Sequence, residues 1–455
     1  MKAIKTPPEW EHGDPLEYLM QNHSQDFPRY MEWYSPVDAK GRYLPFDELR
    51  HRVDKDLSIE LSWGLTKASR LRQYQGYLPA GSSACPYYLT PLMQKTISVT
   101  DRHTTTAALE WMTANIGEAK HFQYLLNDLI EDEAISSSQL EGAATTTLVA
   151  KDMLKRQRQP RTLDEKMILG NYQMMRFAWE HRNAELSPEL IAQMHEEGVS
   201  GVDDDAYTPG VFRQTDDVVV EGVEGEVVHQ PPAAKGIHKR LNRLCTWINT
   251  CHDDAQSRNY LHPLIKAIAI HFAIGYEHPF RDGNGRVARA LFYWFMFKSG
   301  FGAFRYIAIS TLLKKAATKY GKSYLYTETD DMDLTYFIDY QCSIIIKAID
   351  DFVNGYRKAH EDQKAFNAFL WESGLFKKMN DKQTAIVHVA QNRLHKDFTA
   401  ANVKENLDCA YNTANAALKG LVDLGIFERE KQGKEWIYNL KDQDKIKKDW
   451  RGKKG

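Results

Sequence analysis

Apolar residues recur at steps of three and four from about residue 107 onward, a period typical of amphipathic helices. The clearest stripe runs from Phe122 to Ile130. Thr162 precedes two acidic residues and predicts that a helix begins directly after it. Ser187 and Pro188 supply the cap and the first-turn proline of a helix that continues through Met194.

A β-hairpin is predicted from Val218 to Val228, where two Val-rich arms flank the turn sequence Glu221–Gly225 and Pro231-Pro232 ends the second arm. Residues 1–98 are rich in Tyr, Trp and Pro and have weak periodicity, so an irregular, mostly helical lobe is expected there. Helices are further predicted over Ala233–Cys251, Pro263–Tyr276, Gly285–Lys298 and Leu334–His360.

The last unit, roughly Asp381 to Leu440, has the order helix, helix, helix and hairpin, which is typical of a winged helix. Its third helix, Tyr411 to Leu424, carries a single Lys, so protein interaction is favoured over DNA binding, which stays open. The basic tail 441–455 is expected to fray. The sequence predicts five regions. These are an N-terminal lobe at 1–98, a helical region at 99–186 that contains the polar segment 137–142, a helical core at 187–365, the winged helix at 375–440 and the basic tail at 441–455.

Composition narrows the class of protein. The 455 residues include 59 Lys and Arg against 61 Asp and Glu, a net charge of −2, which argues against a chain held on nucleic acid by bulk charge. The five cysteines are scattered and form no C-x-x-C pair, which favours a reducing compartment. The stretch from Met1 to Asp14 contains no apolar core that could serve as a signal peptide, and the densest apolar run, Leu291 to Phe297, is far short of a membrane span. A soluble, cytoplasmic protein without a membrane partner is therefore predicted.

The segment that carries chemistry lies between two predicted apolar helices and reads HPFRDGNGR from His278, with Arg289 three residues further on. Gly283 and Gly285 permit backbone conformations in which successive N–H groups turn toward one anion. The helix that follows adds its own free N–H groups and its positive dipole end. Arg286 and Arg289 lie three residues apart on this helix and can reach the same polyphosphate.

Three further residues complete the loop. Asp282 offers a hard oxygen ligand for Mg²⁺, which prefers one or two carboxylates together with phosphate oxygens. His278 suits general-base work near neutral pH. Phe280 is an apolar residue in a polar loop and is expected to anchor that loop in the core. The combination indicates nucleotide phosphoryl chemistry rather than simple binding.

The same loop matches every specified position of the signature H-x-F-x-[DE]-G-N-G-R-x-x-R, so the chain resembles Fic-domain proteins. The resemblance implies a mainly α fold: a Fic helical core with a β-hairpin flap, a helical N-terminal lobe and a C-terminal winged helix. The likeness takes in Pro209–Arg213, the Val218–Val228 hairpin, Pro231-Pro232 and Asp333–Thr335, and thus runs roughly from Ser187 to Tyr340.

That resemblance implies a protein adenylyltransferase, which transfers AMP from Mg-ATP to a Ser, Thr or Tyr hydroxyl of a target protein or of itself, while pyrophosphate leaves. It implies His278 as the base and Asp282 as the Mg²⁺ ligand. The residues it implies for the ATP phosphates are Arg281, Gly283, Asn284, Gly285, Arg286 and Arg289. It further implies that Val218, Val219 and Val220 align the target backbone, and that Tyr320 and Tyr324 lie near the adenine, with plain packing as the alternative for both tyrosines.

Ser137, Glu141 and Gly142 fit the pattern [ST]-x-x-x-E-[GN] of inhibitory helices in this family. The resemblance implies that Glu141 pairs with Arg289 and so keeps Arg289 from the γ-phosphate. Some relatives also remove AMP, so a reversible enzyme stays open, as does a homodimer. The rival interpretation is a nucleotide-sensing regulatory protein that binds DNA or a partner protein through the winged helix.

Overall fold

The computed structural model describes residues 4–114, 131–202, 208–221, 227–254, 260–391, 397–432 and 435–452. The chain divides into two compact units, one made of Met1–Leu109 with Leu129–Ile349 and the other of Glu110–Asp128 with Asp350–Gly455. Both units are mainly helical. In the described part of the chain, the strands form three separate two-stranded sheets.

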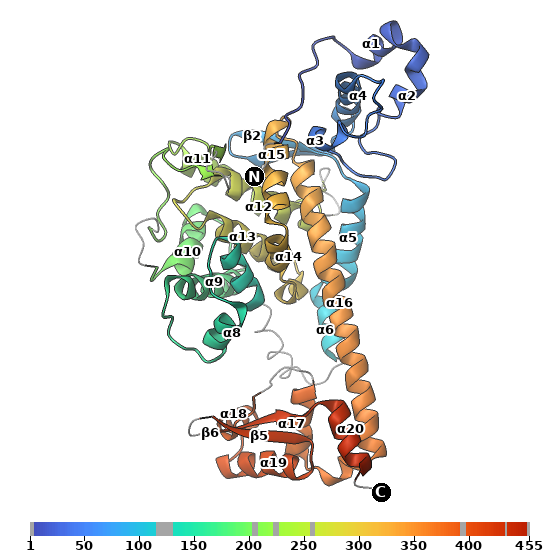
Figure 1. Cartoon of the computed structure of the whole chain (residues 1–455). Coiled ribbons are helices and arrows are strands. Elements are labelled where there is room, and N and C mark those ends of the chain that lie inside the picture. Colours follow the sequence, from blue (N-terminus) through green and yellow to red (C-terminus); the bar gives the residue numbers. More distant parts are fainter. Residues whose placement is uncertain are drawn as a thin grey trace. The chain divides into compact units, whose positions relative to one another are not determined.

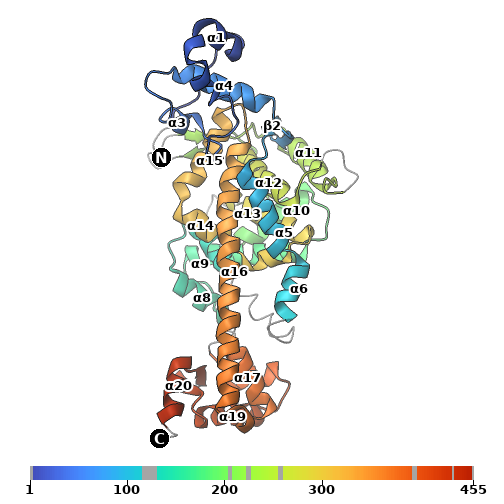
Figure 2. The same cartoon turned by 90° about the vertical axis from the view of Figure 1, so that its right-hand side faces the viewer.

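The N-terminal part of the first unit holds its own small apolar core, in which Trp63 and Leu61 of one helix pack beside Tyr30. Helix α5 then runs beside the first half of α16, the long helix Thr335–Glu372 (Figure 2), and the Thr96 hydroxyl of α5 donates to the Cys342 carbonyl at 3.4 Å. The elements are α1 (Pro15–Asn22), η1 (Ser24–Asp26), α2 (Phe27–Met31), α3 (Phe46–Leu49), α4 (Ile59–Leu71), β1 (Gly76–Ala80), β2 (Ser83–Tyr87), α5 (Pro91–His103) and α6 (Thr106–Ala114).

The β1–β2 hairpin is a departure from the expected helical lobe. Its strands pair with Ala80 opposite Ser83, which leaves a two-residue turn whose first residue, Gly81, has φ +54°. Short turns of this kind need positive φ, and glycine adopts it without strain. Each strand contains a proline, and proline is rare within sheets, so the sequence does not indicate a hairpin here. The structure tolerates both prolines because the two strands of a two-stranded sheet are edge strands.

The helices between residues 131 and 349 largely begin where the sequence predicts. Thr162 caps the helix that starts at Leu163, and Ser187 caps the one that starts at Pro188, each by accepting an N–H three residues ahead. Residues 131–140 are also helical. The elements are α8 (Thr147–Lys155), α9 (Leu163–Glu180), α10 (Pro188–Val199), β3 (Val220–Glu221), β4 (Val227–His229), α11 (Ile237–Asn249), α12 (Pro263–Glu277), α13 (Asn284–Lys298), η2 (Gly302–Tyr306), α14 (Ile309–Lys315), α15 (Ala317–Thr329) and α16 (Thr335–Glu372).

Helices α12 and α13 form the centre of this unit (Figure 1). Nearly every side chain of α12 is buried, and α13 is buried from Arg286 through Phe297. Helices that are apolar on all sides are packed on all sides. The short loop between them is therefore held at both ends by rigid elements.

The predicted hairpin after residue 217 is present in part. Val220 pairs with His229 and Glu221 with Val227, with an irregularity in the register between the two pairs. The turn at 222–226 lies outside the described residues, as does the apolar stripe at 122–130.

The second unit has the element order predicted for it, three helices followed by a hairpin. The tail beyond residue 440 is a correction, because it forms helix α20, with Ile446 buried in the core of this unit. The elements are η3 (Phe376–Lys378), α17 (Asp381–Gln391), α18 (Ala400–Asn406), α19 (Tyr411–Asp423), β5 (Phe427–Gln432), β6 (Glu435–Leu440) and α20 (Gln443–Gly452).

None of the helices in the described ranges combines the length and the apolar character needed to cross a bilayer.

Candidate active site

The loop between α12 and α13 is shaped by its own side chains. Phe280 is fully buried. The side-chain amide of Asn284 accepts from the Phe280 N–H at 2.9 Å and donates to the Phe280 carbonyl at 2.8 Å. This closed pair occupies the Asn284 side chain, so Asn284 can contribute its backbone N–H, but not its side-chain amide, to phosphate binding. Gly283, at φ +80°, makes the turn into α13.

His278 ends α12 in a left-handed conformation with φ +47°, and its N–H donates to the Ile274 carbonyl. Its side-chain Nδ1 lies 3.1 Å from the Gly275 carbonyl oxygen. A carbonyl only accepts, so Nδ1 carries the ring proton and Nε2 keeps its lone pair. Burial lowers the pKa of His278 below the ordinary imidazole value, which favours the neutral form. The ring is therefore set up as a base at Nε2.

The first turn of α13 concentrates positive charge. Arg286 is buried and donates to the Gly198 carbonyl at 3.3 Å. Its guanidinium also lies against Gly283, where an added Cβ would be 3.3 Å from Nη2. Asp282 is partly exposed, and one of its carboxylate oxygens accepts from the Gly283 N–H. The carboxylate thus lies beside the free N–H groups of the helix N-terminus.

Arg289, one turn further on, contacts the segment predicted to be inhibitory. Its Nε donates to the Ser137 hydroxyl at 2.8 Å and its Nη2 to Glu141 Oε1 at 2.7 Å. Although burial opposes it, the guanidinium of Arg289 holds the pKa of Glu141 below its usual value. A Cβ on Gly285 would lie 2.3 Å from Glu141 Oε1. Gly142, at φ +100°, follows the helix that ends at residue 140.

Arg281 and the three valines lie at the exposed edge of this site. Arg281 pairs with Asp217 at 3.1 Å, with both side chains about half exposed. Exposed pairs of this kind contribute little to stability and open readily. Val218 and Val219 lead into β3, where Val220 is paired with His229 of β4.

Tyr320 and Tyr324 project from α15 toward α12. The Tyr320 hydroxyl lies 2.7 Å from His271 Nε2, and the Tyr324 ring stacks on Phe272 at 5.2 Å. Burial raises the pKa of both tyrosines, and the charges of Arg289 and Glu141 also act on them. The structure thus brings these two rings to the same region as Arg289.

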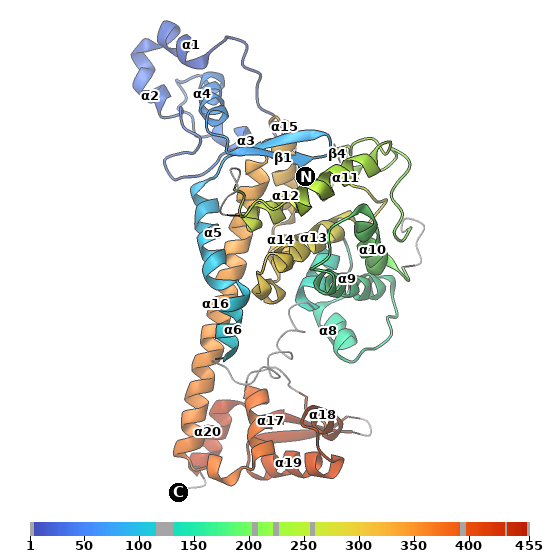
Figure 3. The same ribbon diagram turned by 180° about the vertical axis from the view of Figure 1, so that it is seen from behind.

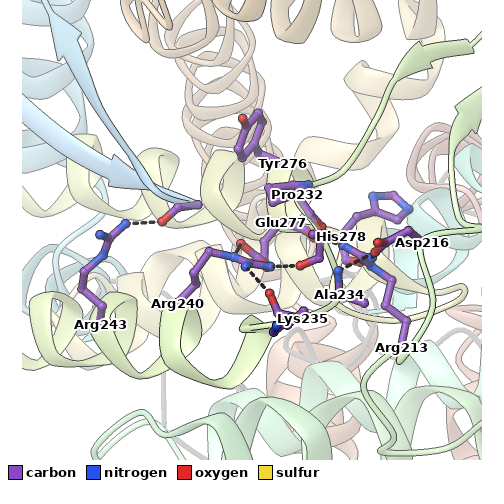
Figure 4. A network of polar contacts seen from close by, with 12 residues as sticks. Arg213, Asp216, Pro232, Ala234, Lys235, Arg240, Arg243, Tyr276, Glu277 and His278 are labelled. Carbon is purple, nitrogen blue, oxygen red and sulfur yellow. Dashed lines mark hydrogen bonds and ion pairs between the residues drawn. The ribbon is translucent and has the colours of Figure 1, made fainter.

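A polar network behind the loop escaped the sequence analysis (Figure 4). Arg213 is buried, and its Nε donates to the His278 carbonyl at 2.8 Å while its Nη2 donates to the Pro232 and Glu277 carbonyls. Arg240 forms a forked pair with the buried Glu277 carboxylate, with Nε 3.0 Å from both oxygens. Arg213 and Pro232 fall within the likeness described from the sequence, but their contacts could not be predicted, because the partners lie many residues apart and isolated charges resemble solvated ones.

Residues 185–296 match a family model described as the Fic/DOC family. A protein adenylyltransferase Fic from Drosophila grimshawi is 26% identical over 219 residues, covering 46% of this chain and 40% of that protein. Another from Nematostella vectensis is 36% identical over 73 residues, 16% of each chain. The chain thus spans less than half the length of these curated relatives.

A solved structure of a Fic family protein from Desulfovibrio desulfuricans aligns with 78% of this chain and 98% of that protein, at 16% identity and a TM-score of 0.49. The family model covers α10 to α13 and the complete loop between α12 and α13. Residues 185–296 of this chain therefore form a Fic/DOC domain.

Proposed function

We propose that this chain is a protein adenylyltransferase that transfers AMP from ATP to a hydroxyl side chain of a protein. The observation that carries the proposal is the arrangement of the loop from His278 to Arg289, in which a neutral imidazole, a carboxylate and two buried guanidinium groups surround one helix N-terminus. The printed names of the curated relatives support the same activity.

The phosphates of ATP would bind at the N-terminus of α13. Backbone N–H groups at Asn284 and Gly285 and the positive end of the helix favour an anion there, while the Gly283 N–H donates to the Asp282 carboxylate. Arg286 lies over Gly283, and Arg289 lies near Gly285. Arg289 is almost fully buried, and within the described residues its Nη1 makes no hydrogen bond. A buried guanidinium with a spare donor suits a phosphate oxygen.

Asp282 would hold Mg²⁺. The fit rests on its chemistry, because a partly exposed carboxylate beside an anion site provides the single protein ligand that Mg²⁺ often uses together with phosphate oxygens. Among the described residues no group of three His, Cys, Asp or Glu side chains could hold a metal, so the phosphates and water would supply the remaining ligands. When bound, the ion neutralises charge on the phosphates.

The reaction would proceed by in-line displacement. His278 Nε2 removes the proton of the target hydroxyl as that oxygen attacks the α-phosphorus of ATP. The bond between the α-phosphorus and the bridging oxygen to the β-phosphate breaks, and pyrophosphate leaves with that electron pair. Arg286 and the helix N-terminus stabilise the charge that develops on the transferred phosphoryl group. The products are an AMP ester of the target and pyrophosphate.

The remaining site residues would orient the two substrates. Val218 to Val220 lead into a two-stranded sheet, and an extended target segment can add to such an edge through backbone hydrogen bonds. Tyr320 and Tyr324 would lie beside the adenine. Arg281 would leave its exposed pair with Asp217 when phosphate binds.

Glu141 would act as an internal brake on this reaction. Its carboxylate pairs with the guanidinium proposed for the γ-phosphate, and it also lies against Gly285 at the start of the anion site. ATP would therefore compete with a charge-assisted contact already present in the resting chain. The Glu141 side chain is 28% exposed, so the contact can open without unfolding the core.

The direct test compares wild type, Glu141→Gly and Glu141→Gly/His278→Ala after incubation with Mg-ATP. Intact mass spectrometry then reads an added AMP on the chain itself or on proteins of a lysate. We expect labelling to rise in the single variant and to vanish in the double variant. Labelling that survives loss of His278 would refute the base, and unchanged labelling in Glu141→Gly would refute the brake. ATP bound without transfer to any protein would favour a nucleotide sensor instead.

A further inference from the structure

One buried histidine outside the loop contacts three parts of the site. His195 lies on α10, next to α13 (Figure 3), and is 2% exposed. Its Nε2 is 3.0 Å from the backbone carbonyl oxygen of Asp282. The Gly210 N–H donates to its Nδ1 at 3.1 Å. Its ring stacks on Phe280 with centroids 3.8 Å apart and an interplanar angle of 7°.

These contacts define the protonation of the ring. Nδ1 accepts from an N–H and therefore carries no proton, whereas Nε2 faces a carbonyl and must donate. His195 is thus the neutral Nε2–H tautomer.

The hydrogen bond from His195 fixes one peptide group of the anion site. In a trans peptide the carbonyl and the following N–H point in opposite directions. Because the Asp282 carbonyl points at His195, the Gly283 N–H points away from the ring, toward the Asp282 carboxylate, which accepts it. Rotation of this peptide would break the bond to His195 and leave a buried ring donor without its acceptor.

The ring also limits how the loop can relax. A Cβ added to Gly283 would lie 3.3 Å from His195 Nε2 and 3.3 Å from Arg286 Nη2, so the Gly283 backbone is held between the two side chains. On its other side, the His195 ring fixes Gly210 in the segment that leads to Arg213. One side chain therefore joins α10, this segment and the phosphate-binding turn.

We propose that His195 is a positioning residue of the nucleotide site, which sets the direction of the Gly283 N–H and holds the Asp282 carboxylate toward a metal-bound polyphosphate. The inference rests on the proposed function, because it assigns the ligand of this turn as the phosphates of Mg-ATP. His195 touches no reacting atom and acts through the Asp282–Gly283 peptide. Residues that orient a metal ligand or a phosphate nest in this way typically change affinity or activity about 10- to 100-fold when replaced.

The test separates positioning from simple packing. His195→Phe keeps the ring that stacks on Phe280 but removes both hydrogen bonds, whereas His195→Gln can still donate to the Asp282 carbonyl. His262→Phe is the matched control, since His262 is also a buried imidazole with two contacts, one to the Leu264 N–H and one to Asp101. All variants are made in the full chain carrying Glu141→Gly, and binding of Mg-ATP and of magnesium pyrophosphate is measured by calorimetry beside thermal unfolding.

We expect His195→Phe to weaken binding of both ligands about 10- to 100-fold. His195→Gln should retain binding within about threefold of the Glu141→Gly reference. It keeps the hydrogen bond to the Asp282 carbonyl and loses only the neutral hydrogen bond from the Gly210 N–H. His262→Phe should lower thermal stability without changing affinity. Equal affinity in His195→Phe and the reference, or equal weakening in His262→Phe, would overturn the positioning role.

The same measurements keep the two proposals apart. If His195→Phe weakens binding as expected but the Glu141→Gly reference transfers no AMP to any protein, the assignment of the turn stands and adenylyl transfer is refuted. If the reference binds neither Mg-ATP nor magnesium pyrophosphate, the nucleotide site is refuted and the role of His195 falls with it.

Discussion

Replacing Arg240 with Gln should destabilise the protein strongly and in a pH-dependent way. Glu277 is 2% exposed, and Arg240 is its forked partner, with Nη2 2.6 Å from Oε1. Charge centres about 4 Å apart attract by about 4 kcal/mol at the effective dielectric constant of partly buried sites. Removing one partner of such a pair typically costs about 3–5 kcal/mol, because the other charge stays buried without compensation. Arg240→Gln should therefore lose about that much unfolding free energy at pH 7.5.

The pH dependence follows from the direction of the Glu277 pKa. Burial raises this pKa above the usual value, even with Arg240 opposing the shift. A carboxyl group with a raised folded-state pKa contributes stability at low pH, and this contribution is lost as pH rises through that pKa. Without Arg240 the pKa rises further, so at about pH 5 Glu277 would be protonated and would no longer need a cation. The loss in Arg240→Gln should shrink accordingly.

The assay is urea unfolding of the full chain, followed by tryptophan fluorescence at pH 7.5 and at pH 5. Arg240→Gln/Glu277→Gln is the control, because two neutral amides leave neither member of this pair as a buried charge without its partner, and it should lie within about 1.5 kcal/mol of wild type at both pH values. The reasoning fails if Arg240→Gln loses the same free energy at both pH values, or if the double variant is as unstable as the single one.

Two further outcomes test the loop itself. Phe280→Ala should lower the unfolding free energy by about 3–5 kcal/mol, because a fully buried ring is lost between His195 and Phe212. The same urea series measures this loss, and a value below about 1 kcal/mol would mean that Phe280 does not anchor the loop. In Glu141→Gly, kcat/KM for AMP transfer should rise with pH and reach half its plateau below pH 6.5, because burial lowers the pKa of His278 and the base must be neutral to act. A kcat/KM that falls as pH rises through this value would contradict the role of His278 as the base.

The sequence predicted best where structure depends on neighbouring residues. The caps Thr162 and Ser187 lie directly before the helices that they start, and both are visible as local patterns. The loop from His278 could also be recognised from the sequence, because glycines, a carboxylate and two arginines fall within a few positions of one another. The β1–β2 hairpin was missed although Gly81 and Ser82 form a plausible two-residue turn, since Pro79 and Pro86 argued against strands.

The parts that could not be predicted depend on pairs distant in the chain. Arg240 and Glu277 are 37 residues apart, and His195 reaches Asp282 across 87 residues. Neither spacing follows from any local period, and each residue alone is indistinguishable from a solvated charge or a packed ring. Asn284 shows a different limit. The family motif assigned it to the phosphates, but its side chain turns inward and pairs with the Phe280 backbone.

These distant contacts explain how a short, glycine-containing loop can hold a fixed shape. Glycine lowers the cost of the required backbone angles but does not select them. The angles are selected by side chains. From outside the loop, His195 holds the Asp282 carbonyl and Arg213 holds the His278 carbonyl. Within the loop, Asn284 holds the Phe280 backbone. If the loop binds the phosphates of ATP as proposed, donors fixed before binding would leave little ordering to be done when the nucleotide binds. The signature of the loop thus supplies the chemistry, while buried residues elsewhere in the domain determine its geometry.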